Sequence, residues 1–122
     1  MNDNPWRGFD DPDYELVDIG RPAVFLVPNR VLTGEVRGLL EQFLKETYGG
    51  FQRPTCLVSG VYTSNAGDTV LDDCVQYEVS FKGKERIPEL ARMLANVARL
   101  TGEECIYLKA GQYASLLRPK AR

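Results

Sequence analysis

Two stretches of the sequence repeat apolar residues every three or four positions, and each stretch ends at a glycine. The first, residues 33–50, opens with Thr33, a residue type that caps helix N-termini. The second, residues 87–102, carries Pro88 in its first turn and closes at Gly102. These patterns predict two amphipathic helices of about four turns, each of which must bury one face against another element.

Strand-like runs lie before, between and after the two predicted helices. Residues 23–27, AVFLV, form an apolar run typical of a short central strand covered on both faces. Residues 74–81, CVQYEVSF, alternate apolar and polar, so that strand buries one face and leaves the other wet or free to bind. Residues 55–64 are rich in β-formers, and residues 105–117 predict a terminal hairpin that turns at Gly111.

The resulting order, β-α-β-β-α-β with one added strand, is that of the split βαβ arrangement. We therefore expect an α+β fold, a ferredoxin-like βαββαβ sandwich with two helices on one face of an antiparallel sheet and an extra C-terminal hairpin strand. Over residues 23–117 the chain resembles small ferredoxin-like domains, including uncharacterised bacterial ones. The features that carry this resemblance are Glu78 on the alternating strand and the run ECIYLKAG after the second helix. It implies a topology with an open sheet face and no particular activity.

The chain divides into three parts by composition. Residues 1–22 form an acidic, aromatic N-terminal arm, residues 23–117 a single α+β domain, and residues 118–122 a short basic tail. With 43% apolar and 26% charged residues the composition is that of an ordinary globular domain. No apolar run approaches the ~20 residues of a membrane span, and the first residues do not resemble a secretory signal. We expect a cytoplasmic location and no contact with membranes.

The N-terminal arm holds six acids against two arginines, together with the aromatic residues Trp6, Phe9 and Tyr14. Exposing such large apolar surfaces to water is costly. We therefore favour an arm that docks through these three residues onto the body or onto a partner subunit, with a loose tail as the alternative.

Missing residue types exclude several kinds of chemistry. The chain has no histidine, so catalytic triads of serine or cysteine with histidine are absent, and a zinc site would need carboxylates. Its three cysteines, Cys56, Cys74 and Cys105, have no C-x-x-C spacing and are expected to be reduced thiols in or near the core. We expect no metal and no cofactor. We do not expect nucleic acid as a partner, because no stretch concentrates lysine and arginine.

The segment SNAGDTVLDDC gathers three carboxylates, Asp68, Asp72 and Asp73. Their spacing does not match the calcium loop, and no glutamate follows at the closing position. We interpret the segment as the turn between the second and third strands, with Asp72 and Asp73 facing water.

Five residues are candidates for a binding face on the open side of the sheet: Tyr62, Gln76, Glu78, Tyr107 and Lys109. If they converge, Glu78 can act as a base with a pKa raised by burial, or can form an ion pair with Lys109. The expected strand order separates these two residues by about 10 Å of sheet. They are equally consistent with ordinary solvent-facing positions, so no catalytic residue is assigned.

Two functional hypotheses follow. We favour a small non-enzymatic interaction or regulatory protein that acts through its open sheet face and its N-terminal arm as a homodimer, with a homo-oligomer or another protein as its partner. The alternative is a small-molecule enzyme or ligand-binding protein of the ferredoxin-like dimer type with a pocket lined by glutamate and tyrosine.

Overall fold

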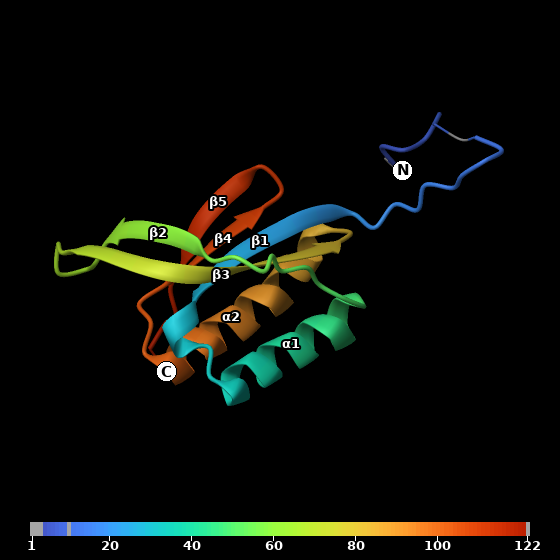
Figure 1. Ribbon diagram of the computed structural model, residues 1–122. Helices are drawn as coiled ribbons and strands as arrows, with labels where there is room; N and C mark the ends of the chain where they lie inside the picture. The colour runs from blue at the N-terminus through green and yellow to red at the C-terminus, as the bar shows by residue number, and fades with distance from the viewer. Residues whose placement is uncertain (1–3, 10, 122) are drawn as a thin grey trace.

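The computed structural model describes residues 4–9 and 11–121. Five strands form one curled antiparallel sheet, and two helices cover one of its faces, which makes an α+β fold (Figure 1). In chain order the elements are β1 (Arg21–Pro28), α1 (Gly34–Tyr48), β2 (Val58–Thr63), β3 (Thr69–Phe81), α2 (Ile87–Thr101), β4 (Ile106–Ala110) and β5 (Tyr113–Leu117). No helix among these residues is long and apolar enough to cross a membrane.

Both helices begin and end where their sequence patterns predict. The Thr33 hydroxyl accepts a hydrogen bond of 3.3 Å from the backbone N–H of Val36 and so caps α1. Pro88 lies in the first turn of α2, where a missing N–H costs nothing. Gly49 and Gly102 adopt the left-handed conformation that closes each helix.

The strand order is β2-β3-β1-β4-β5, so β1 lies at the centre with β3 and β4 antiparallel on either side. The sequence predicted that the first and third strands would be central, and this is confirmed. The third strand is longer than predicted. It begins at Thr69 instead of Cys74, because residues 69–74 pair along their whole length with β2.

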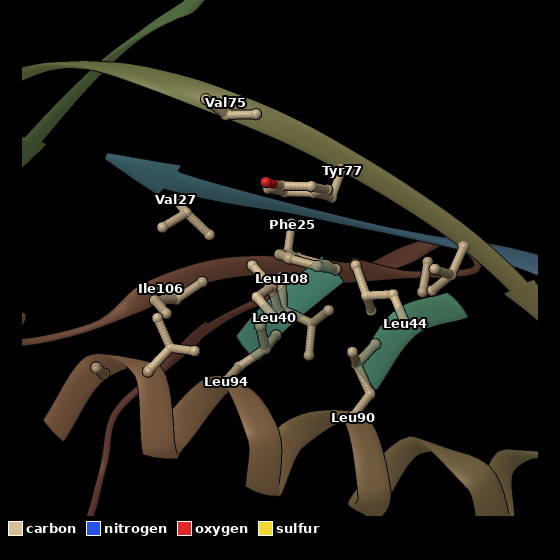
Figure 2. Packing of buried hydrophobic residues seen from close by; sticks show 14 of the residues in the cluster. Phe25, Val27, Leu40, Leu44, Val75, Tyr77, Leu90, Leu94, Ile106 and Leu108 are labelled. Carbon is tan, nitrogen blue, oxygen red and sulfur yellow. The ribbon is translucent and has the colours of Figure 1, made fainter. Parts of the chain in front are cut away.

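The core fills the space between the sheet and the helices (Figure 2). Phe25 of β1 stacks on Tyr77 of β3, with ring centroids 5.3 Å apart. Leucines of α1 and α2, among them Leu40 and Leu94, pack beneath them and are fully buried. The Tyr77 side chain is inaccessible to solvent. Its buried hydroxyl has a hydrogen-bond partner, because it donates to the carboxylate of Glu41 at 2.6 Å.

The N-terminal arm leaves the sheet at Gly20, two residues before the predicted boundary, and runs away from the body (Figure 1). Trp6, Phe9 and Tyr14 line a hollow within the arm itself and keep 45–60% of their surface exposed. These residues therefore do not dock onto the body of their own chain. Docking onto a partner subunit stays a prediction. The C-terminal tail is attached to the body, since Arg99 donates two hydrogen bonds to the carbonyl of Lys120.

Candidate functional site

The sheet face opposite the helices, which we call the open face, carries apolar residues at its centre. Ala23, Phe25 and Val27 of β1 are buried against the helices, whereas Val24 and Leu26 point the other way and are half-buried. The expectation that this strand is covered on both faces is wrong for the single chain, because no second layer of the described residues covers the open face. An apolar centre on an otherwise polar sheet face is a feature of binding surfaces.

The strand register places four of the five predicted binding residues on two rows of the open face. Leu26 pairs with Gln76 on one side and with Tyr107 on the other. Val24 likewise lies between Glu78 and Lys109. Directly paired residues of antiparallel strands point to the same side, so these side chains share the open face.

Glu78 and Lys109 do not meet, because Val24 of β1 lies between them. No side-chain hydrogen bond or ion pair joins the two within the described part of the chain, so the ion pair considered from the sequence is not formed. The backbone of Glu78 is held on its other side by Gln52, with two reciprocal N–H···O bonds of 2.8 Å. This arrangement fixes the backbone of Glu78 while its side chain remains on the open face.

A cluster that the sequence did not predict lies at the end of the open face, beyond the last residue of β1. Arg30 donates to both carboxylate oxygens of Asp72, at 2.9 and 3.2 Å, and to both oxygens of Glu103, at 2.9 and 3.2 Å. The two carboxylate side chains are only 9% exposed, against 55% for the arginine. We call these three residues the end cluster. One arginine serves two nearly buried carboxylates, so the cluster carries a surplus negative charge.

Tyr62 and Cys74 lie beside the end cluster, and its carboxylates contribute to raising the pKa values of both side chains. Burial raises the pKa of the Tyr62 hydroxyl, and the carboxylates of Glu103 and Asp72 raise it further. Burial likewise raises the pKa of the Cys74 thiol, with Asp72 and Glu103 as additional causes. Both groups therefore stay protonated at neutral pH. Tyr62, the fifth predicted residue, lies beside the end cluster and not in the rows around Leu26.

The interpretation of SNAGDTVLDDC as a solvated turn is correct for Asp68 but wrong for Asp72. The turn spans residues 64–68, where the Ser64 hydroxyl accepts from the N–H of Asp68, whereas Asp72 lies inside β3. Alternation along β3 puts Asp72 and Cys74 on the open face and Asp73 on the other, where Asp73 is exposed and accepts from Ser59. No local pattern marks Asp72, because its partner, Arg30, is 42 residues away in the chain.

The β2–β3 hairpin closes this end of the sheet. The backbone N–H of Asn65 at its tip donates to Glu104, just before β4, at 3.1 Å. The Asn65 side chain accepts from Arg118, just after β5, at 3.1 Å. The two bonds link the tip of the β2–β3 hairpin to the residues just before β4 and just after β5, on the other side of β1, and the sheet curls there. The end cluster lies at this same end of the sheet.

The three cysteines are free thiols, as expected. Cys74 is buried and Cys105 half-buried, but Cys56 is exposed, in the irregular segment before β2, which corrects the expectation for that residue. Within residues 4–9 and 11–121 no group of three or more potential ligands is arranged to hold a metal ion.

The fold and the site define an α+β protein whose helix-free sheet face ends in an enclosed, negatively charged cluster. Among solved structures, the chain is similar to a phage SAM lyase in complex with S-methyl-5'-thioadenosine, with a TM-score of 0.61 and 17% identity over 85% of this chain and 94% of that one. It is also similar to a phage SAM lyase in the apo state, with a TM-score of 0.53 and 14% identity over 88% and 99% of the two chains. No protein-family model and no curated protein matches the sequence.

These likenesses correct the function favoured from the sequence. The structures that share the fold over nearly their whole length are those of an enzyme, which contradicts a non-enzymatic interaction protein and favours the small-molecule alternative. The sequence was misleading because it lacks histidine and every nucleotide-binding motif. Carboxylate and tyrosine sites have no such local signature.

Proposed function

We propose that this protein is a small-molecule enzyme that acts on an adenosyl sulfonium compound of the S-adenosylmethionine type. The substrate would lie on the open face with its sulfonium toward the end cluster. The proposal is supported by the likeness to a lyase whose structure holds S-methyl-5'-thioadenosine, and by a site whose charge suits such a ligand. This nucleoside is what remains of S-adenosylmethionine after the bond from sulfur to the amino-acid chain breaks.

The surplus negative charge of the end cluster is the observation that carries the proposal. A sulfonium is a fixed cation that cannot donate a hydrogen bond, so a protein recognises it mainly through nearby negative charge and aromatic faces. Asp72 and Glu103 share one arginine and are nearly buried, where a charge interacts more strongly than it does in water. Tyr62 adds a neutral aromatic ring beside them.

The neighbouring rows of the open face suit the nucleoside part of the ligand. Leu26, Tyr107 and Leu116 follow one another across three adjacent strands in register. Tyr107 and Leu116 are 37% and 46% exposed, so an apolar strip is available to a flat base. Gln76 lies at the end of the same row and can hydrogen-bond to polar atoms of the base or sugar.

The reaction would remove the charge that the end cluster recognises. When the sulfur–carbon bond breaks, its electron pair stays on sulfur and the sulfonium becomes a neutral thioether. The carboxylates therefore favour the bound substrate over the product and promote release of S-methyl-5'-thioadenosine. The remaining amino-acid fragment either closes through its own carboxylate or loses a proton to a base, for which Glu78 is the candidate on the open face.

The test is to incubate the purified protein with S-adenosylmethionine and to follow release of S-methyl-5'-thioadenosine by chromatography, with S-adenosylhomocysteine as the uncharged control. We expect release from the sulfonium alone, and weaker calorimetric binding of the uncharged thioether. Mass spectrometry of the amino-acid fragment then separates the two routes. If the protein neither binds nor cleaves the sulfonium, the proposal is refuted. If it binds the sulfonium without cleaving it, the protein is only a ligand-binding protein.

We also infer that, within the α+β class, the fold is ferredoxin-like. This is supported by the order β2-β3-β1-β4, in which each helix connects two strands that are split by a third, and by both helices lying on one face. β5 extends this sheet at the β4 edge. A crystal structure with another strand order would contradict it.

A further inference from the structure

A second apolar hollow lies on the helix side of the sheet, away from the open face. It has a volume of about 300 Å³ and forms where β5 extends past the edge of α2. Its lining includes Ile87 and Ala91 of α2, Ala110 of β4, and Tyr113 and Leu117 of β5. We call it the α2–β5 groove. Tyr113 is 72% exposed, so the groove is open to a partner.

The N-terminal arm is another large apolar surface without a cover in the single chain. Six apolar side chains between residues 6 and 19 are at least 40% exposed: Trp6, Phe9, Tyr14, Leu16, Val17 and Ile19. Burying a large apolar side chain contributes roughly 1.5–3 kcal/mol, so six of them favour an additional contact strongly. An arm of this composition is expected to dock.

The charges of the two surfaces are complementary. The described residues of the arm hold four acids, Asp11, Asp13, Glu15 and Asp18, against the single cation Arg7. In contrast, β5 and the tail, residues 113–121, hold Arg118 and Lys120 and no acid. Opposite charges around an apolar contact select the partner and its orientation.

The root of the arm directs it away from the groove of its own chain. Asp18 accepts from the N–H of Gly20 at 2.9 Å and forms an ion pair of 3.7 Å with Lys82, at the end of β3. Gly20 packs against the backbone of Phe81, also on the β3 side. The groove lies on the opposite side of β1, toward β4 and β5. In Figure 1 the arm accordingly runs clear of the body.

We propose that the N-terminal arm of one copy docks into the α2–β5 groove of a second copy. The aromatic side chains of the arm fill the groove, and its acids lie beside Arg118 and Lys120, which follow β5. Because the arm and the groove are different surfaces, reciprocal exchange gives a closed dimer or ring. The proposal does not depend on the proposed activity, since the groove and the open face lie on opposite sides of the sheet.

Two variants of the full chain test this by light scattering after gel filtration and by sedimentation. One carries Trp6→Ser and Phe9→Ser in the arm, and the other carries Tyr113→Asp in the groove, an exposed position that tolerates a polar residue. We expect an oligomeric wild type and a dissociation constant raised at least tenfold in each variant, which corresponds to about 1.4 kcal/mol. Leu100→Asp, at an exposed position near the end of α2, is the matched control and should leave the oligomer unchanged.

Mixing the variants gives the decisive result. The arm variant keeps an intact groove and the groove variant keeps an intact arm, so the mixture should regain a complex with one arm–groove contact. A monomeric wild type would overturn the proposal. This holds also if the arm resists proteolysis, because it would then be folded onto its own chain. An oligomer that persists in either variant would also overturn it, because another surface would then hold the copies together. Circular dichroism of each variant confirms that the fold is intact.

Discussion

Two buried tyrosine hydroxyls differ in whether they have a partner. Tyr77 donates to Glu41, which also receives hydrogen bonds from Arg37 and Arg53. The hydroxyl of Tyr48 is buried and has no hydrogen-bond partner among the described residues. A hydroxyl bonded to a charged group stabilises a fold, whereas an unpaired buried one costs free energy.

This difference predicts opposite outcomes for the same substitution. Tyr77→Phe should lower the free energy of unfolding by about 1.5–3 kcal/mol, because it removes a hydrogen bond to a carboxylate. Tyr48→Phe should change it by no more than about 0.5 kcal/mol, or should stabilise the protein, because no bond is lost. Urea unfolding of both variants measures the effect, and equal losses would contradict this account of the two side chains.

Under the proposed function, the end cluster predicts a charge effect on binding of the sulfonium substrate. Asp72→Asn removes the surplus negative charge, so KM for the sulfonium should rise about tenfold, which corresponds to about 1.4 kcal/mol. The value of kcat should not fall, because the carboxylates stabilise the charged bound substrate at least as well as the transition state, in which that charge is being lost.

Asp73→Asn is the matched control for that experiment. Asp73 is the next residue in the chain, carries the same charge and points to the other face of β3. We expect the KM of this variant, measured by steady-state kinetics, to equal that of the wild type. Equal effects of the two substitutions would show that the cluster has no direct role in recognition.

At the scale of secondary-structure elements, local signals were sufficient where each element is defined by its own residues. Both helices begin and end as predicted, because caps and apolar periodicity act within a few residues. The start of β3 was predicted five residues late, because Asp72 and Asp73 are typical of turns and obscured the strand pattern. Pairing with β2 overrides that local preference.

The junction between the arm and β1 depends on one glycine. Gly20 has a φ of +95°, and a Cβ atom at this position would overlap the backbone carbonyl of Phe81. Gly20→Ala should therefore lower the free energy of unfolding by at least about 2 kcal/mol. Gly60→Ala is the control, since a Cβ atom there meets its neighbours at ordinary contact distances of 3.6 and 3.7 Å. Thermal unfolding of the two variants should separate them clearly, and equal transition temperatures would refute the argument.

For the whole molecule, the raised pKa values of its buried phenols predict a loss of stability in alkali. Burial, with Glu89 as a further cause, raises the pKa of Tyr48 from 10.0 to about 12. Burial also raises the pKa of Tyr62 and Tyr77. Above pH 10 these groups ionise more readily in the unfolded chain than in the folded one, so the folded state binds more protons and stability falls as pH rises.

The contribution of Tyr48 is therefore fully present below pH 10 and is lost as the pH rises through about 12. Urea unfolding between pH 7 and pH 11.5 should show a decline that is shallower in Tyr48→Phe than in the wild type above pH 10. The thiols of Cys74 and Cys105, whose pKa values are also raised, contribute equally to both proteins. Identical declines would contradict the assignment to Tyr48.

The sequence by itself determined the two helices, the central strand, the inward face of β3 and the four open-face residues Gln76, Glu78, Tyr107 and Lys109. Each of these follows from periodicity and caps, which are local properties. Only the tertiary structure decided the end cluster, because Arg30 meets Asp72 and Glu103 across 42 and 73 residues of chain. The curl of the sheet brings these residues together, and it depends on edge contacts that leave no periodic trace in the sequence.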